Sequence, residues 1–600
     1  MRTDSHGTGP SRTIDPRIFG CMVLIATAIL IVSCAHREGR QDNPTPATLE
    51  TSEAYSDYGM VSTGSEEATR AGVQILEQGG NAVDAAVAAA FALGVADPGG
   101  SGLGGMTYIL FSSVEGHAIA IDGTATAPVG ADRMALLELR NSGEPFGAKA
   151  VAVPATLAAL SHALIRYGTM NLDTVMAPAI RYAEEGSRLN SNSIAWTTGY
   201  LKEILASRYL KYVVLDSGEH IGSSGDRFCR PDLAATLRQI ALEGSESFYR
   251  GTIARKMLAD VAALGGYLRP LDLSLMRATE LEPLRSEYRG AEVISYPWPG
   301  GGAEVTRSLQ ILETFSPNFL RKPSVDRLQV MIEASRIAQA DSLEFIHSPS
   351  LQGTGPAGYL SVADAQMRAN LITPGRAIPE DKLQKPSTTP RMGEHTTHVS
   401  VADRWGNAVS MTQTLCRQYG AKVATPGLGF PYNSCLEFFD YENPSSPSFL
   451  RPRARYSSTM APTIVRRDGS LLVLGSAGSD RIPGSEIEVI SCVIDRDMGI
   501  RDAVIAPRVL WNSAHDPPRV CLEIADWVTQ ADADTLQSWG FENMFRLEYP
   551  AIPAADSAFF GGVNAVLYDA ATGIFSGVGD PRRSGFAEGP RTVVNPQERP

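Results

Sequence analysis

The segment Glu394-His395-Thr396-Thr397-His398-Val399-Ser400-Val401 decides how the rest of this sequence is interpreted. It follows a loop-like stretch, 373–394, that contains several prolines and glycines, and it opens a β-rich run. If the bond before Thr396 were cut, its hydroxyl would share a residue with a free α-amine of pKa about 7.7–8, which can act as a general base. The alternative is an ordinary threonine in a strand.

A change of hydrophobic pattern at this segment divides the chain. Residues 151–390 are expected to be mostly helical, with helices at 155–167, 233–243 and 324–345. Strands are expected afterwards, with one helix at 485–494. The expected strands are 397–402, 408–414, 470–475, 562–568 and 574–578, the first two joined by the hairpin segment Asp403-Arg404-Trp405-Gly406-Asn407.

Upstream, the chain predicts two helices followed by a glycine-rich loop. Thr63 and Glu66 have capping-box spacing before a helix from about Ser65 to Gly79. Residues 81–95 are apolar all round, which is typical of a buried helix. The loop 99–105 satisfies G-x-G-x-x-G, but it precedes a strand at 106–111. A dinucleotide site needs strand, loop and then helix, so close backbone packing is expected here instead.

Composition and charge exclude several classes of protein. The chain has 600 residues, 43% of them hydrophobic and 20% charged, which suits a globular enzyme with a large core. Its net charge of −13 excludes nucleic acid as the expected partner, because phosphate binding needs a basic face. G-x-S-x-G, H-E-x-x-H and P-loop motifs are absent from the sequence.

The N-terminus predicts export. Arg17 precedes an apolar run, 18–32, of the length typical of a signal-peptide core. It ends in Ile31-Val32-Ser33-Cys34, which resembles a bacterial lipoprotein box with Cys34 as the lipidated residue. We therefore expect a signal peptide at 1–33 and a lipid-anchored tether at 34–58, in the periplasm and on the outer membrane. The alternatives are an ordinary export signal and an uncleaved anchor.

Cysteines and histidines give weaker signals. Five cysteines remain beyond Cys34, so at least one is expected to be unpaired in an oxidising compartment. No C-x-x-C pair occurs, and His395 and His398 lack a third ligand cluster. We expect neither a metal site nor an organic cofactor.

Several long motifs resemble the γ-glutamyltranspeptidase family of N-terminal-nucleophile hydrolases, across about Tyr58 to Ala587. They occur in one order along the chain, which makes the resemblance specific. The motifs are Gly59-Met60-Val61-Ser62-Thr63, Gln78-Gly79-Gly80-Asn81-Ala82-Val83-Asp84-Ala85-Ala86, Ser101-Gly102-Leu103-Gly104-Gly105, Thr396-Thr397-His398-Val399-Ser400-Val401, Gly406-Asn407-Ala408-Val409-Ser410, Ala461-Pro462-Thr463-Ile464-Val465 and Asp580-Pro581-Arg582-Arg583.

The resemblance implies an α+β fold, a four-layer αββα sandwich, that cuts itself between His395 and Thr396. The implied products are a large subunit, 59–395, and a small subunit, 396–600, which form a heterodimer. Thr396 would be the nucleophile and Thr414 a supporting hydroxyl.

Other site residues follow from the same resemblance. Ser458 and Thr459 resemble the Ser-Ser pair that holds the substrate carboxylate. Gly478 and Ser479 resemble the Gly-Gly pair whose amides form the oxyanion hole, where Ser479 can donate as glycine does if its φ is tolerated.

This sequence departs from the family where the family recognises an α-amino acid. Thr124 stands where family members usually carry an arginine, so a bidentate contact to carboxylate is lost. Cys416, Cys435 and Phe438 match the family's amine-pocket residues, with Glu437 beside them. The two cysteines could form a disulfide lining the pocket or remain buried free thiols.

These features predict an exported, self-cleaving enzyme that hydrolyses or transfers a γ-glutamyl or related acyl group, as from glutathione, through an acyl-threonine. The expected partners are a small amide substrate and water or an amine acceptor, with membrane contact only through the lipid anchor. The alternatives are a divergent acylase or amidase on another envelope amide, and an uncleaved, inactive binding lipoprotein.

Overall fold

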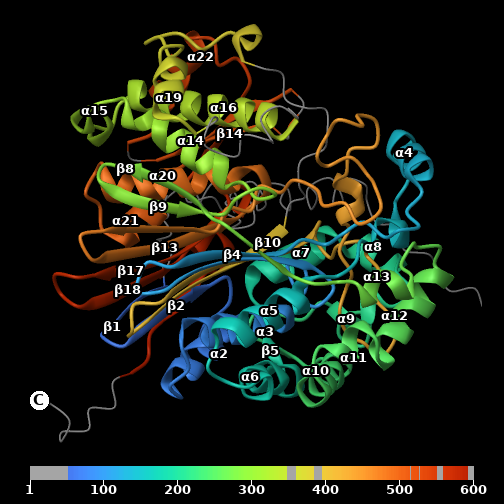
Figure 1. The fold of residues 1–600 in the computed structure, drawn as a ribbon. Helices are drawn as coiled ribbons and strands as arrows, with labels where there is room; N and C mark the ends of the chain where they lie inside the picture. The colour runs from blue at the N-terminus through green and yellow to red at the C-terminus, as the bar shows by residue number, and fades with distance from the viewer. Residues whose placement is uncertain are drawn as a thin grey trace, which may run out of the picture. The chain divides into compact units, whose positions relative to one another are not determined.

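Two facing seven-stranded sheets form the centre of the protein in the computed structural model, which describes residues 52–347, 360–383 and 395–591 except 514, 516, 526 and 550–557. Helices cover the outer face of each sheet (Figure 1). The predicted four-layer αββα sandwich is confirmed. Within the described residues, no helix is long and apolar enough to cross a membrane.

The first sheet contains strands from both ends of the chain. Its strands, all antiparallel to their neighbours, are in order β1 (Ser52–Ser56), β18 (Ile574–Gly579), β17 (Gly562–Asp569), β13 (Ser470–Ala477), β12 (Thr463–Arg467), β9 (Ala291–Ser295) and β8 (Leu284–Tyr288). The predicted tether, 34–58, is wrong for its last residues, because Ser52–Ser56 pairs with β18 as an edge strand. The predicted signal peptide and Cys34 lie outside the described residues.

The second sheet carries His395 and Thr396. Its strands, again antiparallel, are β19 (Phe586–Glu588), β2 (Gly59–Thr63), β10 (His395–Asp403), β11 (Ala408–Cys416), β3 (Met106–Ser112), β4 (Ala118–Gly123) and β7 (Thr279–Leu281). Each sheet therefore combines strands that precede residue 395 with strands that begin at or follow it. If the chain were cut before Thr396, the two pieces would stay joined by these hydrogen bonds.

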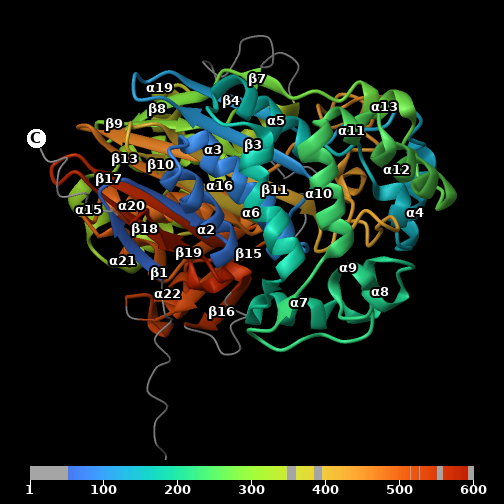
Figure 2. The same cartoon turned by 90° about the horizontal axis from the view of Figure 1, so that it is seen from below.

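The helices are amphipathic on the outside and apolar where they are enclosed. On the second sheet lie α2 (Glu66–Glu77), α3 (Ala82–Ala96) and α5 (Thr156–Tyr167), with α6 (Leu172–Glu185) against α3 and α10 (Pro231–Glu243) against α6 (Figure 2). On the first sheet lie α14 (Gly302–Glu313), α20 (Ile482–Ile494) and α21 (Ile500–Ile505), with α16 (Val325–His347) against α14. Almost every residue of α3 is buried, as its uniformly apolar sequence predicts.

Smaller elements complete the described chain. A third sheet contains β14 (Val509–Asn512), β15 (Arg519–Ile524) and β16 (Met544–Glu548), flanked by α22 (Gln530–Ser538). A two-residue pair joins β5 (Ser187–Arg188) to β6 (Arg227–Phe228). The remaining α-helices are α4 (Arg133–Ser142), α7 (Ser191–Gly199), α8 (Leu201–Ala206), α9 (Leu210–Val214), α11 (Glu246–Tyr249), α12 (Thr252–Ala263), α13 (Pro270–Ser274), α15 (Pro317–Arg321) and α19 (Val362–Ala369).

The predicted capping box at Thr63 and Glu66 is wrong. Thr63 is the last residue of β2, and its hydroxyl donates to the Ser65 carbonyl, so it is not available to cap α2. The capping box of this region belongs to α3, where Asn81 and Asp84 bond each other's backbone amides.

Candidate active site

Thr396 and Thr414 lie opposite each other on β10 and β11. The Thr414 hydroxyl donates to the carbonyl oxygen of His395 over 2.6 Å and accepts from the amide of Cys416 over 2.8 Å. The Thr396 hydroxyl is buried and has no hydrogen-bond partner among the described residues. A buried hydroxyl without a partner is uncommon in a folded protein and is a candidate for chemistry.

The peptide bond between His395 and Thr396 coincides with an irregularity in the strand. The pairing of β10 with β11 shifts register between these two residues. Such a bulge re-aims side chains and is over-represented beside active sites. Here it places the His395 carbonyl, which accepts a hydrogen bond from Thr414, next to the Thr396 hydroxyl, which has no hydrogen-bond partner among the described residues.

A small cavity of about 40 Å³ lies at this point, and none of the residues predicted as substrate-binding lines it. It can hold water but not a substrate, because ligand pockets enclose roughly 300–1,000 Å³. Its lining residues are Gly64, Asp97, Asn190, Asn192, Ser193, Trp196, His395, Thr396, Thr397, His398, Ala477, Gly562, Asn564 and Arg583. Asp97, Trp196 and Arg583 were not predicted as site residues, although Arg583 lies in the motif Asp580-Pro581-Arg582-Arg583.

Arg583 and Asp97 bring buried charge to this cavity. Burial lowers the pKa of Arg583 to about 9. Burial also raises the pKa of Asp97 to about 6, although the Gly100 N–H and the Arg583 charge lower it in part. The side chain of Arg583 donates a hydrogen bond to the Ala558 carbonyl. The preceding residue, Arg582, is buried and forms ion pairs with Glu523 and Asp580. The motif thus positions one cation at the cavity.

His395 is neutral in this environment. Its ring packs edge-on against Trp196, with centroids 4.1 Å apart. Burial first, and then the nearby cations Arg583, Arg481 and Lys422, hold its pKa well below the usual value. His395 therefore adds no positive charge beside the bond that precedes Thr396.

The glycine-rich loop 99–105 packs against the end of β11 and the segments around it. A methyl group on Gly105 would lie 2.4 Å from the Thr414 carbonyl oxygen, and one on Gly104 would lie 2.1 Å from that of Pro431. The loop runs from α3 into β3. The predicted close backbone packing is confirmed, and the loop supports the Thr414 end of the strand.

Gly478 and Ser479 follow β13 directly, where Ala477 lines the Thr396 cavity. Gly478 has φ 134°, and a methyl group there would lie 2.8 Å from Gly561 Cα. Ser479 has φ 61°, a left-handed conformation that few non-glycine residues adopt. Two successive residues with positive φ form the turn into the short 3₁₀ helix η4 (Ser479–Arg481) ahead of α20.

Cys416 and Cys435 form a disulfide. The Tyr456 hydroxyl lies 2.9 Å from Cys416 Sγ, and Phe439 packs on the Tyr456 ring with centroids 5.5 Å apart. Cys229, Cys492 and Cys521 are free, so the expectation of at least one unpaired cysteine is confirmed. The disulfide ties the end of β11 to η3 (Cys435–Phe438), next to Thr414.

The remaining predicted residues are distributed around this aromatic region. Thr124 donates its hydroxyl and its amide to Asp122 Oδ1, at 2.5 and 2.8 Å, and Asp122 Oδ2 pairs with Arg455 at 3.0 Å. Ser458 donates its amide to the Pro299 carbonyl over 2.7 Å. Thr459 is buried, and its hydroxyl has no partner among the described residues.

Glu437 lies apart from the Thr396 cavity. It pairs with Arg417 at 2.5 Å and lines a different groove, of about 620 Å³, with Arg140 and Tyr200. The sequence could not show this, because the direction of a side chain on a 3₁₀ turn depends on the segments packed around it.

His398 is a structural residue between the two sheets. Its ring nitrogens contact the hydroxyls of Thr412 at 2.9 Å and Ser400 at 3.0 Å, and burial lowers its pKa to about 3. A methyl group on Gly475 would lie 2.1 Å from the ring, so glycine is required opposite it. Among the described residues, no three His, Cys, Asp or Glu side chains gather as metal ligands.

The buried Asp97 predicts an unusual pH dependence of stability. Because its pKa rises from 3.8 to about 6 on folding, the unfolded chain binds fewer protons across that window, so this group makes the fold less stable as pH rises through it. The two-unit shift corresponds to about 3 kcal/mol. Asp97→Asn should therefore lose less unfolding free energy than wild type as the pH rises from 4 to 7. Urea denaturation at each pH measures the unfolding free energy. Parallel stability curves for variant and wild type would contradict it.

Comparisons with known proteins agree with this geometry. The family model described as Gamma-glutamyltranspeptidase matches residues 68–589. A glutathione hydrolase proenzyme of Escherichia coli (strain K12) is 34% identical over 469 residues, 75% of this chain and 80% of the relative. An acylase ACY 1 proenzyme of Pseudomonas sp. (strain V22) is 34% identical over 536 residues, which cover 87% of this chain and 92% of the relative.

A solved structure supports the same relationship. The cephalosporin acylase from Bacillus halodurans superposes with a TM-score of 0.79 at 27% identity, covering 92% of this chain and 98% of that one. This chain therefore belongs to the γ-glutamyltranspeptidase family and is a γ-glutamyltransferase- or glutathione hydrolase-like amidohydrolase of the N-terminal-nucleophile type.

Proposed function

We propose that this enzyme activates itself by cutting the His395–Thr396 bond and then uses Thr396 as a nucleophile on an amide. The observation that carries the proposal is the hydrogen bond from Thr414 to the carbonyl of His395, beside the unpartnered hydroxyl of Thr396. That arrangement polarises the carbonyl and leaves the attacking oxygen free. Several relatives are named proenzymes, which is consistent with cleavage.

The cleavage is an N-to-O acyl shift followed by hydrolysis. The Thr396 oxygen attacks the carbonyl carbon of His395, a C–O bond forms, the C–N bond breaks, and the hydroxyl proton passes to the departing amine. Water, for which the cavity has room, then cleaves the ester and leaves His395 with a carboxylate. The large subunit, 59–395, and the small subunit, 396–600, stay paired through β10 and its neighbours.

In the mature enzyme the same oxygen attacks a substrate amide. The new α-amine of Thr396 accepts the proton, and the amides of Gly478 and Ser479 stabilise the oxyanion. The amine of the substrate leaves with a proton, and an acyl-threonine remains. Water or an amine acceptor releases the acyl group. Departure of the His395 end would enlarge a cavity that is too small for a substrate in the uncut chain.

The acyl group differs from L-γ-glutamyl in this proposal. Thr124 supplies no cation, and a disulfide occupies the positions 416 and 435 of the family's amine pocket. The space beside them is filled by buried aromatic rings. Tyr108 stacks on Tyr296 with centroids 4.3 Å apart, and Tyr456 covers the disulfide. The relatives named acylases support this divergence.

The enzyme is exported in this proposal, with Cys34 as the lipid-bearing first residue of the mature chain. The motif Ile31-Val32-Ser33-Cys34 and the apolar run before it support the anchor. A disulfide beside the site is consistent with an oxidising compartment such as the periplasm.

Cleavage should depend on the Thr414 hydroxyl. Thr414→Val keeps the shape but removes the donor to His395, and it should slow conversion of precursor to two fragments by about 10²–10³-fold, the usual cost of one oxyanion donor. Thr414→Ser should restore most of the rate, since it keeps the hydroxyl. Fragment appearance is followed on denaturing gels after synthesis. Wild-type cleavage rates in Thr414→Val would contradict the role.

Glutathione should be a poor substrate for the mature enzyme. Without a cation at 124 and an open amine pocket, we expect a KM well above about 1 mM, the upper end of the usual range for enzymes. A panel of anilides that share one leaving amine and differ in acyl group measures the preference, with Thr396→Ala as the inactive control. A KM for glutathione at or below about 1 mM would contradict the altered specificity.

The anchor predicts where the enzyme fractionates. In a Gram-negative host, wild type should follow the membranes, whereas Cys34→Ser should fail to take up labelled palmitate and should leave them. Equal palmitate labelling of the two proteins would contradict Cys34 as the lipidated residue.

A further inference from the structure

The disulfide between Cys416 and Cys435 lies beside the two threonines of the candidate active site. Cys416 is the last residue of β11, where it is paired with His395, and Cys435 is the first residue of η3. Thr414, two residues before Cys416, donates the hydrogen bond to the His395 carbonyl. The disulfide therefore fixes the end of the strand that lies opposite the scissile bond.

The amide of Cys416 orients the Thr414 hydroxyl. It donates to Thr414 Oγ1 over 2.8 Å, while the same hydroxyl donates to the His395 carbonyl over 2.6 Å. A threonine hydroxyl can turn toward several partners, so an amide that occupies one of its lone pairs restricts where its proton points. Cys416 thus acts on the scissile carbonyl through Thr414, as a positioning residue.

This amide depends on an unfavourable backbone conformation. Cys416 has φ 76°, in the region that favours glycine and that other residues adopt at a cost. Such a conformation persists only where surrounding contacts hold it. The Ser434 amide donates to the Leu415 carbonyl over 3.0 Å, and the Arg417 amide donates to the Ser434 hydroxyl over 3.3 Å. The disulfide to Cys435 adds a covalent bond between the same two segments.

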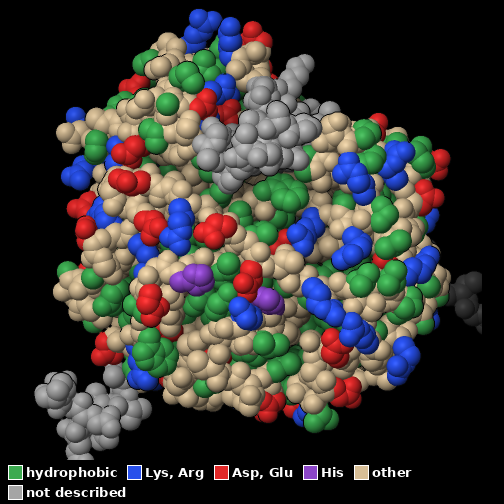
Figure 3. Space-filling model, in the orientation of Figure 1, with side chains coloured by type: hydrophobic (Ala, Val, Ile, Leu, Met, Phe, Trp, Pro, Cys, Tyr) green, Lys and Arg blue, Asp and Glu red, His purple; other side chains and the backbone are tan. Residues whose placement is uncertain are grey.

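The two sulfur atoms lie in close packing. Cys416 and Cys435 have no exposed surface, so neither contributes to the surface drawn in Figure 3. The Tyr456 hydroxyl lies 2.9 Å from Cys416 Sγ and 3.5 Å from Cys435 Sγ. Bonded sulfur atoms lie about 2 Å apart, whereas unbonded heavy atoms rest roughly 3.5–4.0 Å apart. Two thiols at these positions would therefore push the end of β11 away from η3.

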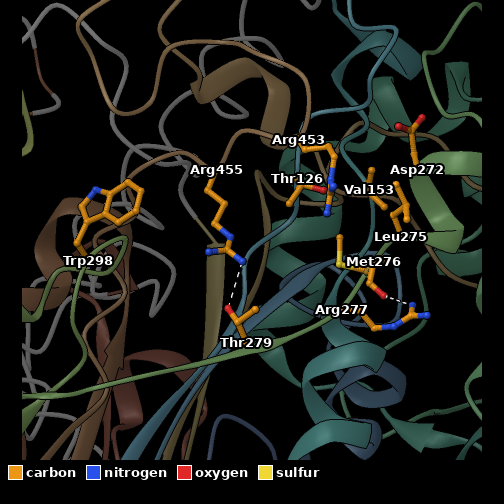
Figure 4. Close-up of a pocket in the computed structure, with 10 residues that line it drawn as sticks. All are labelled: Thr126, Val153, Asp272, Leu275, Met276, Arg277, Thr279, Trp298, Arg453 and Arg455. Carbon is orange, nitrogen blue, oxygen red and sulfur yellow. Dashed lines mark hydrogen bonds between the residues drawn. The ribbon is translucent and has the colours of Figure 1, made fainter.

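The segment before Tyr456 holds that ring in place. Arg453 donates its amide to the Ala127 carbonyl over 2.9 Å, and Arg455 pairs with Asp122 at 3.0 Å. Figure 4 shows the side chains of Arg453 and Arg455 at the wall of a cavity of about 340 Å³, and neither cysteine lines that cavity. Because Tyr456 is fixed on its own side, separated thiols would displace β11 and η3.

We propose that the Cys416–Cys435 disulfide controls self-cleavage, because it holds the Cys416 amide that directs the Thr414 hydroxyl to the His395 carbonyl. When the disulfide forms, the two thiols lose two protons and two electrons to an external protein disulfide by thiol–disulfide exchange, and that protein becomes a dithiol. The precursor cuts slowly where its thiols stay reduced, and rapidly after export to an oxidising compartment. This inference rests on the proposed self-cleavage before Thr396 and adds its regulation.

Cell-free synthesis of the full chain tests the proposal, in a buffer with dithiothreitol or in one with an oxidised thiol–disulfide oxidoreductase. Fragments on denaturing gels give the cleavage rate, and alkylation of free thiols reports whether the disulfide has formed. Wild type should cut about 10-fold faster in the oxidising buffer, since a non-glycine residue at positive φ then keeps its support. Cys435→Ser should cut slowly in both buffers. Cys229→Ser is the control and should behave as wild type, because Cys229 is exposed and free.

Glycine at position 416 separates the backbone role from a failure to fold. Glycine adopts positive φ readily, so Cys416→Gly added to Cys435→Ser should recover most of the lost rate. Cys416→Ala added to Cys435→Ser should recover none of it. Equal rates in these two double variants would overturn the proposal. Equal rates for wild type in the two buffers would also overturn it, when alkylation shows the disulfide in only one of them.

A double-mutant cycle tests whether the disulfide acts through Thr414. The chain with both Thr414→Val and Cys435→Ser should cut at about the rate of Thr414→Val alone, because one hydroxyl carries both effects. Losses that multiply would overturn the positioning role of Cys416. A wild-type chain that stays uncut in both buffers would instead count against the proposed self-cleavage.

Discussion

The hydrogen bond from the Thr414 hydroxyl to the His395 carbonyl depends on the pairing of β10 with β11. A slip of one residue in either strand would turn the threonine of that strand to the other face of the sheet, because side chains alternate along a strand. Several features hold the register: the Gly105 approach to the Thr414 carbonyl, the disulfide at Cys416, and the neighbouring strands β2 and β3. The reactive geometry is thus a property of the whole sheet.

Hydrolysis and recognition are separable in this fold. The cavity at Thr396 and the turn at Gly478 lie at the ends of central strands, which the sandwich holds rigidly. We propose that specificity depends on segments outside the reactive strands, including the aromatic rings around the Cys416–Cys435 disulfide. The family's relatives include both glutathione hydrolases and acylases, which fits a constant reactive centre with variable surroundings.

The features that the sequence predicted correctly are those that depend on residues close together in the chain. The uniformly apolar run of α3, the hairpin of β10 and β11 and the close packing of the glycine loop followed from periodicity and turn chemistry. Contacts between distant segments could not be predicted in this way. Trp196 reaches His395 from a helix two hundred residues earlier in the chain, and Arg455 pairs with Asp122 across the fold. The edge strand β1 was missed because its short polar sequence becomes a strand only through β18.

N-terminal sequencing of the smaller fragment from purified enzyme tests the central claim most directly. If the chain is cut before Thr396, the smaller fragment begins with Thr-Thr-His-Val-Ser. The Thr396→Ala variant should give a single uncut chain without this new terminus. A mature enzyme that hydrolyses amides as one intact chain, or whose fragment begins at any other residue, would contradict the account.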